Sequence, residues 1–300
     1  MKPETSVINV FGKHNIYVEH YKKDEAAKTL ILVNGAFATT SSFNQTVRYL
    51  KDKVNILLFD LPYAGRSKEH NRGHDILTKD DEVEILLNLI ERYRVNYLMS
   101  VSWGGVSSLL SLAKRPPSIE RAVIASFSPV INNAMSNYMA GARDFLQTGD
   151  ISSAAQLLNN TVGRYLSGLV KSHNFQYLLS SVGGNEEQII FHINQIFDFD
   201  QEQYMHRFSS IDVPVLFMNG ELDEYTTPQD ARCLADHIQQ SEFTVVENAG
   251  HFLEHESRQL GRKVNGIVKD WMFGPEPDYA APTRFSVSGT ENLAYADAGD

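Results

Sequence analysis

The sequence lacks the cysteines that a disulfide framework needs, because Cys233 is the only one among 300 residues. A chain with one cysteine cannot form an internal disulfide and fits a reducing compartment. Long apolar runs are also missing: the strongly apolar stretches fall far short of the roughly 20 residues that cross a bilayer. Residues 1–5 are not followed by the apolar stretch of a secretory signal. The sequence therefore predicts a cytoplasmic protein without a membrane span.

Positive charge is scarce as well. The chain has 27 Lys and Arg residues against 37 Asp and Glu residues, which gives a net charge of -10. Phosphate backbones bind to basic surfaces, so this composition argues against nucleic acid as a partner. An acidic partner would have to bind to a local cluster of Lys and Arg. The 42% hydrophobic composition, in contrast, is enough to build one large core.

Short runs rich in Ile, Leu and Val recur along the chain, with helix-like segments between them. Apolar runs without alternation are typical of parallel strands that are covered on both faces. The segment 80–92 carries one broad apolar face and begins with acidic residues, as a helix start favours. We therefore predict a mostly parallel sheet with helices on both faces. The expected strands are residues 7–10, 16–20, 29–33, 55–59, 97–101, 122–126, 213–218 and 243–246.

The alternation stops once. Residues 131–209 have the pattern of helices only, and the strand pattern resumes near residue 213. This order predicts one core domain, residues 1–130 and 210–272, that carries an inserted helical cap, residues 131–209. Residues 273–300 are rich in Pro, Ala, Ser and Gly and lack periodicity, which predicts a disordered tail.

A candidate nucleophile lies where the fifth expected strand ends and a helix begins. The sequence there, Ser100-Val101-Ser102-Trp103-Gly104, has small residues two before and two after Ser102. A tight strand-to-helix turn needs such small residues, and it exposes the serine hydroxyl at the edge of the sheet. Serine replaces the usual glycine at position 100. Ser102 could instead be an ordinary helix cap, but its place in the strand order favours the nucleophile.

A serine hydroxyl becomes a good nucleophile only beside a base that a carboxylate orients. In this kind of sheet the expected chain order is serine, acid, histidine. Asp223 follows the seventh expected strand and His251 follows the eighth, so we predict a triad of Ser102, Asp223 and His251. Competing carboxylates in the same loop region are Glu221, Glu224 and Asp230.

A metal site and a cofactor are not expected. His255 lies four residues after His251, but the sequence between them does not match the zinc-binding pattern H-E-x-x-H. The remaining histidines have no comparable loop context and are assigned to the surface or the cap.

A negatively charged tetrahedral intermediate would need two backbone N–H donors. The first expected donor is Trp103, directly after the serine. The second should lie in the loop after the strand at residues 29–33, where Asn34 and Gly35 precede Ala36. We assign the second donor to Ala36, with Phe37 as the alternative.

With these residues in place, the chain resembles the α/β-hydrolase superfamily. Residues 60–67, which read DLPYAGRS, look like the D-x-P-G-x-G-x-S segment that follows the fourth strand in that superfamily. Tyr63 stands where the family has a glycine, which could reshape the rim of the pocket. The resemblance implies the α/β-hydrolase fold.

A narrower resemblance covers the chain from near residue 1 to about residue 272. It is to the synthases that make the 3-(3-hydroxyalkanoyloxy)alkanoate lipid of rhamnolipids, and to the sister 3-hydroxyacyl-acyl carrier protein:CoA transacylases. Two segments, residues 126–132 (SFSPVIN) and 191–195 (FHINQ), look at least as much like the transacylases. The segments that resemble the synthases are residues 33–36 (VNGA), 38–43 (ATTSSF), 58–62 (LFDLP), 78–87 (TKDDEVEILL), 102–105 (SWGG), 223–227 (DEYTT) and 250–253 (GHFL).

Both families imply a 3-hydroxyacyl donor on an acyl carrier protein, an acyl group held on Ser102, and no cofactor. The leading interpretation is the synthase, with the transacylase or a thioesterase as alternatives and an idle lipid-binding module as a further one. The acceptor decides between them: a second hydroxyacyl group, coenzyme A, or water. Candidate substrate contacts are Asn34, Phe37, Tyr138 and Phe191. The candidate cations for binding the acidic carrier protein are Arg66, Lys68, Arg164, Lys171 and Arg207.

Overall fold

The computed structural model describes residues 2–275 apart from residues 26, 37, 72, 74, 75, 199 and 200. Most of the predicted tail, from residue 276 on, lies outside the described residues. In the described part, the strands form one eight-stranded sheet in the order β1-β2-β4-β3-β5-β6-β7-β8. Its strands are β1 (Glu4–Val10), β2 (His14–Tyr21), β3 (Thr29–Val33), β4 (Asn55–Phe59), β5 (Tyr97–Val101), β6 (Arg121–Ala125), β7 (Val215–Gly220) and β8 (Ser241–Val246).

The sheet is mostly parallel. β1 and β2 form an antiparallel hairpin at one edge, and β2 pairs antiparallel with β4, whereas every pair from β4 to β8 is parallel. All residues of β3, β4, β6 and β7 are buried, as expected for strands covered on both faces. The predicted α/β fold is therefore confirmed.

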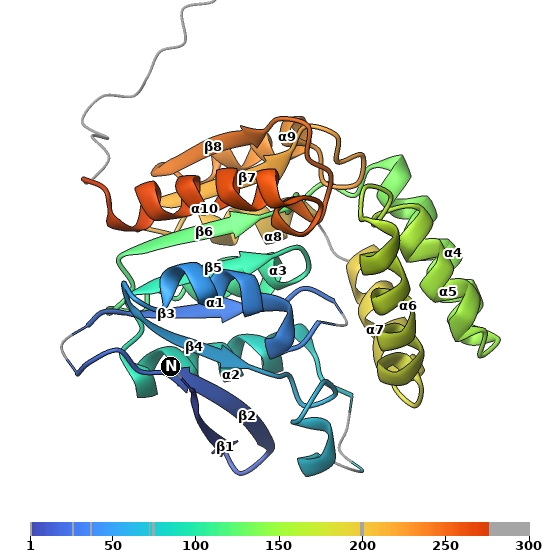
Figure 1. Ribbon diagram of the computed structural model, residues 1–300, viewed down its shortest axis with the longest axis horizontal. Helices are drawn as coiled ribbons and strands as arrows, with labels where there is room; N and C mark the ends of the chain where they lie inside the picture. The colour runs from blue at the N-terminus through green and yellow to red at the C-terminus, as the bar shows by residue number, and fades with distance from the viewer. Residues whose placement is uncertain are drawn as a thin grey trace, which may run out of the picture.

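Helices cover both faces of the sheet (Figure 1). One face packs against α1 (Asn44–Leu50) and α10 (Arg258–Phe273), and the other against α2 (Lys79–Tyr93), α3 (Gly104–Leu112) and α8 (Gln201–Phe208). α2 starts at a capping box in which Thr78 and Asp81 exchange hydrogen bonds. Short helical elements complete the core: α9 (Pro228–Ala231), η1 (Thr40–Phe43), η2 (Lys68–His70), η3 (Arg232–Asp236) and η4 (Leu253–His255).

The inserted segment lies beyond the carboxyl ends of the parallel strands, to the right in Figure 1. It contains α4 (Asn133–Gln147), α5 (Ile151–Asn160), α6 (Gly168–Val182) and α7 (Glu186–Phe197), which share an apolar cluster of their own. The last helix of the predicted cap, α8, packs differently, because Tyr204 and Phe208 belong to the cluster of the core. Within the described residues, no helix has the combination of length and apolarity that a bilayer crossing requires.

Candidate active site

Ser102 lies on a sharp turn between β5 and α3. Its φ is +50°, in the left-handed region that residues other than glycine rarely adopt. Two hydrogen bonds hold the turn: the N–H of Ser102 donates to the carbonyl of Ala125 at 2.8 Å, and the N–H of Gly105 donates to the carbonyl of Ser102 at 2.8 Å. Strained backbone of this kind persists where surrounding structure imposes it, and it is concentrated at functional sites.

The turn leaves no room for a side chain at position 104. A Cβ atom on Gly104 would lie 2.4 Å from the carbonyl oxygen of Asn34 and 3.0 Å from that of Val33. Alanine at this position would therefore push α3 away from the loop after β3. On the strand side, Ser100 is completely buried, so serine fits where the motif more often has glycine.

The structure brings Ser102, His251 and Asp223 together. The Nε2 atom of His251 lies 2.9 Å from the Oγ atom of Ser102, and the Nδ1 atom lies 2.8 Å from the Oδ2 atom of Asp223. Asp223 and His251 are both buried. All three follow the carboxyl ends of parallel strands, β5, β7 and β8, which meet at one edge of the sheet.

The carboxylate of Asp223 is held in its charged form. It accepts hydrogen bonds from the N–H groups of Tyr225 at 2.9 Å and Thr226 at 3.1 Å, and from the Thr226 hydroxyl at 2.6 Å. Burial alone would raise the pKa of Asp223. The electrostatic interaction with His251 and these hydrogen bonds outweigh burial, so the pKa of Asp223 lies below its ordinary value.

The competing acids face other groups. Glu221 accepts a hydrogen bond from the N–H of Asn248 at 2.8 Å, and Glu224 pairs with Arg164 at 3.0 Å. His255 is exposed, and its nearest acid is Glu254 at 3.8 Å. Among the described residues, no group of three or more His, Cys, Asp or Glu side chains is arranged to hold a metal ion.

Two side chains that the sequence analysis missed fix the loop that carries His251. Glu256 accepts hydrogen bonds from the N–H groups of Gly250 at 2.8 Å and Phe252 at 3.1 Å, the two neighbours of His251. The hydroxyl of Ser126 donates to the carbonyl of His251 at 2.6 Å. The spacing of Glu256, five residues after the histidine, was visible in the sequence, but its orientation toward the loop depends on the η4 turn.

The two assigned oxyanion donors lie beside Ser102. Trp103 begins the turn of α3, and Ala36 and Trp103 both line the cavity into which Ser102 opens. A Cβ atom on Gly35 would lie 3.2 Å from the Cβ atom of Ser102, so the loop backbone runs in contact with the serine. The alternative donor, Phe37, lies outside the described residues.

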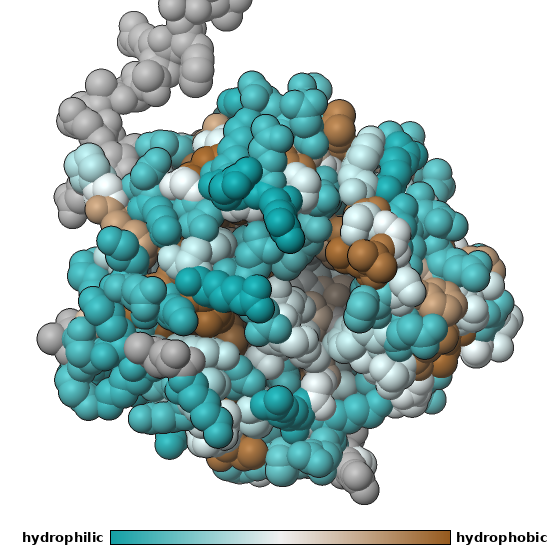
Figure 2. Space-filling view, viewed as in Figure 1, coloured by the Kyte–Doolittle hydropathy of each residue, from teal (hydrophilic) through white to brown (hydrophobic). Residues whose placement is uncertain are grey.

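The cavity has a volume of about 710 Å³ and is lined mainly by apolar side chains, within the range of roughly 300–1,000 Å³ of ligand pockets. Figure 2 shows the surface hollowed between the core and the cap. Residues of both the cap and the core form the walls of the cavity. Cap residues that line it include Met135, Tyr138, Met139, Leu178, Ile189 and Ile193, and core residues include Phe43, Met99, Ala125, Met218 and Val264.

Of the candidate substrate contacts, Tyr138 lines the cavity. Asn34 does not line it, because it is buried where its carbonyl abuts the start of α3. Phe191 does not line it either, whereas His192 does. Successive residues of a helix point about 100° apart, so the position next to the predicted one carries the side chain that faces the site. Phe37 again lies outside the described residues.

A buried polar cluster adjoins Trp103, and the sequence analysis did not identify it. The Nζ atom of Lys79 lies 2.8 Å from a carboxylate oxygen of Glu82, and the other oxygen lies 3.6 Å from the Nε2 atom of His192. The amide of Gln188 donates to the same Nε2 atom at 2.7 Å and also exchanges hydrogen bonds with the backbone of Leu77. The acidic start of α2 pointed only to helix capping, although Lys79 and Glu82 have the spacing of a helical ion pair.

The imidazole of His192 should make stability pH-dependent. Burial lowers its pKa to about 3, and the charge of Lys79 contributes. An unfolded histidine titrates near 6.5, so between these values the unfolded chain binds a proton that the folded chain does not, and stability falls with falling pH. From pH 7 to pH 4, the free energy of unfolding should fall by up to about 3 kcal/mol more in the wild type than in His192→Gln.

Urea unfolding at both pH values measures this difference. His173→Gln is the control, because His173 also lines the cavity but is exposed, and this variant should keep the pH dependence of the wild type. Equal loss of stability in His192→Gln and the wild type would contradict the prediction.

Known proteins are similar to this chain in sequence and in fold. The profile of a family described as alpha/beta hydrolase fold matches residues 28–257. An "(R)-3-hydroxydecanoyl-ACP:CoA transacylase" of Pseudomonas aeruginosa is 46% identical over 86% of this chain and 86% of its own length. The protein of that name from Pseudomonas putida is 44% identical over 89% of this chain and 91% of its own length.

Solved structures are similar in fold at low identity. An alpha/beta hydrolase enzyme from a Medee basin deep-sea metagenome library superposes with a TM-score of 0.75 at 19% identity, over 92% of this chain and 100% of that one. The enol-lactonase of Burkholderia xenovorans superposes with a TM-score of 0.73 at 18% identity, over 89% of this chain and 99% of that one.

Proposed function

This chain belongs to the α/β-hydrolase fold family, and from that premise we propose that it is a transacylase that moves 3-hydroxyacyl groups from acyl carrier protein to coenzyme A. The observation that carries the proposal is the serine, histidine and aspartate constellation at the wall of a large apolar cavity. The transacylase names of the relatives at 43–46% identity support the choice of donor and acceptor.

The chemistry follows from the geometry. His251 takes the proton of the Ser102 hydroxyl as its oxygen attacks the thioester carbonyl of the carrier-bound acyl group. The carbonyl oxygen gains negative charge, which the N–H groups of Trp103 and Ala36 stabilise. When the intermediate collapses, the carbon–sulfur bond breaks, and His251 returns the proton to the departing thiol. The acyl group is then esterified to Ser102.

The second half repeats these steps with a new nucleophile. The thiol of coenzyme A gives its proton to His251 and attacks the ester carbonyl, and Ser102 leaves with the proton restored. Water is a competing acceptor. The apolar lining of the cavity disfavours bulk water around the ester, so a bound thiol in the correct position reacts first.

The synthase, which the sequence analysis favoured, is the second candidate. Its acceptor would be the hydroxyl of a second 3-hydroxyacyl group, which needs room for two acyl chains at Ser102. The observation in its favour is the extent of the cavity walls, which include residues of the cap cluster and residues of the cluster between the sheet and α1 and α10. The names of the curated relatives favour the transacylase.

One experiment separates the acceptors. Pure protein is incubated with 3-hydroxydecanoyl-acyl carrier protein, with and without coenzyme A, and the products are identified by mass spectrometry. A coenzyme A thioester formed only when coenzyme A is added supports the transacylase. Formation of the 3-hydroxyacyl ester dimer at the same rate in both mixtures would establish the synthase instead, and free acid alone would identify a thioesterase.

Docking of the carrier protein should depend on Arg164 and Lys171. Both lie on the cap segment that contributes Leu166 and Val170 to the cavity wall. Leu169, between them, is 80% exposed. Arg164 pairs with Glu224, and Lys171 donates to the carbonyl of Arg164. Arg66 and Lys68 also have partners, Glu19 and the carbonyl of Gly183, and neither they nor Arg207 lie on this segment.

Reversal of both charges, Arg164→Glu and Lys171→Glu, should raise the KM for the carrier-bound donor about tenfold at low salt, because carrier proteins are acidic. The effect should shrink as salt screens the charges. Hydrolysis of a small p-nitrophenyl ester should not change. Steady-state kinetics at two ionic strengths measure these effects.

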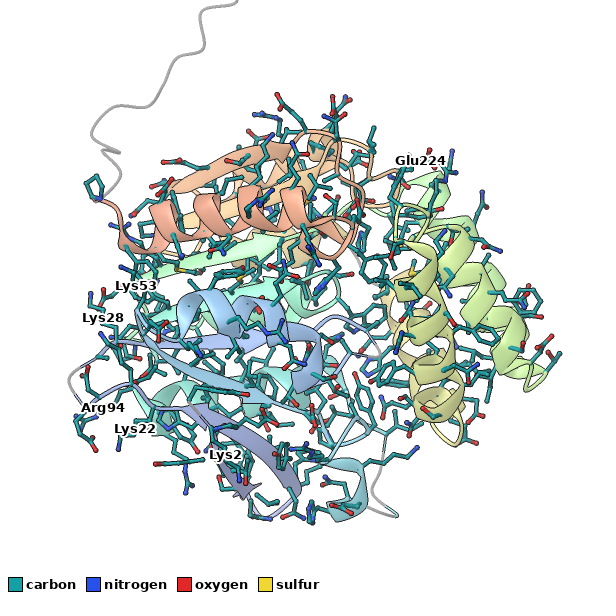
Figure 3. All side chains as sticks on the ribbon, viewed as in Figure 1. Lys2, Lys22, Lys28, Lys53, Arg94 and Glu224 are labelled. Carbon is teal, nitrogen blue, oxygen red and sulfur yellow. The ribbon has the colours of Figure 1, made fainter. Side chains whose placement is uncertain are left out.

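The control is a second double variant that changes the net charge of the protein by the same amount at a site far from the cap. Lys53 and Arg94 precede β4 and β5, and Figure 3 labels both at the edge of the sheet away from the cap, whereas Glu224 lies beside the cap. Lys53→Glu with Arg94→Glu should leave the KM unchanged. An equal rise of KM in both double variants would place the docking surface elsewhere.

A further inference from the structure

An ion pair is buried at the start of α2, next to the proposed nucleophile. The side chains of Lys79 and Glu82 are each only 2% exposed, and their charged groups lie 2.8 Å apart. Burial lowers the pKa of Lys79, and the charge of Glu82 opposes that shift. Buried ion pairs rarely add stability, since apolar residues of similar volume can often replace them without loss. The stability of the fold therefore does not explain why this pair is here.

The pair is in contact with Trp103. The Nζ atom of Lys79 lies 4.6 Å from the centre of the indole ring, which is the distance of a cation–π contact. The ring of His192, which is close to Glu82, packs edge-on against the same indole with 5.6 Å between ring centres. The indole is therefore fixed by charged and polar groups from α2 in the core and from α7 in the cap.

Trp103 occupies the position at which small displacements matter most. It follows Ser102 directly, and its backbone begins α3. Under the proposed function its N–H stabilises the negative charge that forms on the carbonyl oxygen. Displacement of such a group by about 1 Å can cost a factor of about 10² in rate. The backbone just before it is strained, with a φ of +50° at Ser102, and such a conformation persists only where surrounding contacts impose it.

We propose that the Lys79–Glu82 pair is a positioning device: by fixing the indole of Trp103, it holds the backbone N–H of Trp103 in line with the developing oxyanion. His192 contributes from the cap and couples the cap to this donor. The inference rests on the proposed Ser102 chemistry, but it does not depend on the identity of the acyl donor or acceptor. Neither Lys79 nor Glu82 lines the cavity, so neither touches the substrate.

The test removes both charges together. Lys79→Met with Glu82→Leu leaves no unpaired buried charge, whereas either single variant would. For a small p-nitrophenyl ester, kcat should fall about 10²-fold in the double variant while KM stays within twofold. The reason is that the displaced N–H of Trp103 stabilises charge only as the oxyanion forms. The midpoint of thermal unfolding should stay close to that of the wild type. A double variant with the stability and kcat of the wild type would overturn the proposal.

A matched control is the pair of Lys263 and Glu247. Its charged groups are also 2.8 Å apart, but both side chains are exposed. Lys263→Met with Glu247→Leu should not change kcat. If the buried double variant does not fold, Lys79→Gln with Glu82→Gln keeps a hydrogen bond without charge, and the same fall of kcat is expected.

A second measurement asks whether the pair acts through the indole. In Trp103→Phe, removal of the pair should lower kcat by less than twofold further, because the indole through which the pair acts on the N–H is already gone. An additional fall of about 10²-fold in that background would show independent action and overturn the proposal. The p-nitrophenyl ester assay also tests the role of the Lys79–Glu82 pair separately from the proposed transacylase function. Failure of the wild type to transfer acyl groups to coenzyme A would refute the proposed function but would not change the kcat values measured with this ester.

Discussion

Ser102→Ala is expected to reduce acyl transfer on the order of 10⁶-fold, because alanine removes the oxygen that attacks the thioester and carries the acyl group. The fold should be intact, because the hydrogen bonds that hold the turn are made by the backbone of Ser102 and remain in the alanine variant. Two measurements are needed: the rate of coenzyme A thioester formation, and the mass of protein quenched after one turnover. The wild type should gain the mass of one 3-hydroxyacyl group, and Ser102→Ala should gain none.

Ser108→Ala is the control for this variant. Ser108 lies on α3, the helix that follows Ser102, is completely buried and does not line the cavity, so its loss should leave the rate unchanged. Labelling by a fluorophosphonate should likewise occur in the wild type and Ser108→Ala but not in Ser102→Ala. Acyl adducts that persisted in Ser102→Ala would mean that another residue is the nucleophile.

Asp223→Asn is expected to lower kcat by about 10⁴-fold. Asparagine keeps the size of the side chain but loses the charge that stabilises the protonated imidazole of His251. Its amide can also present a donor to the Nδ1 atom, which favours the wrong tautomer of the ring. The hydrogen bonds from the backbone of Tyr225 and Thr226 can remain, so binding of the donor and the stability of the fold should change much less than kcat.

The competing acids provide the comparison. Glu221→Gln and Glu224→Gln should keep kcat within about twofold, because these carboxylates face Asn248 and Arg164 rather than His251. Steady-state kinetics of the three variants at one pH are sufficient. Near-native activity in Asp223→Asn, with a loss in either glutamate variant, would assign the role of the acid to that glutamate.

The sequence alone led to the three residues that the structure brings together, because their signals are local. Ser102, Asp223 and His251 each follow a short apolar strand, and the carboxyl ends of neighbouring parallel strands meet at one edge of the sheet. Once the strand order was recognised, the place of each loop followed from topology. The glycine at position 104 was equally predictable, since a close approach of helix and loop leaves no room for a side chain.

Which helical residues face the cavity could not be predicted in the same way. The cap helices carry apolar residues on more than one side, and only their packing decides which side turns toward Ser102. For this reason the sequence predicts a contact at Phe191, whereas His192 is the residue that lines the cavity. The packing of α8 against the core could not be predicted for the same reason. Its sequence pattern is that of a helix whether it packs in the cap or on the core, and the burial of Tyr204 and Phe208 depends on distant residues.

The sequence by itself thus determined the succession of strands along the chain, the helical segment between β6 and β7, and the three loops that carry Ser102, Asp223 and His251. Only the tertiary structure decided that Lys79 and Glu82 are buried and that their contacts reach Trp103 and His192. The physical reason is the range of the interactions. The tendency to form a strand, helix or turn is specified by neighbouring residues, whereas a lysine near a helix start is normally solvated and loses its water only when distant segments close over it.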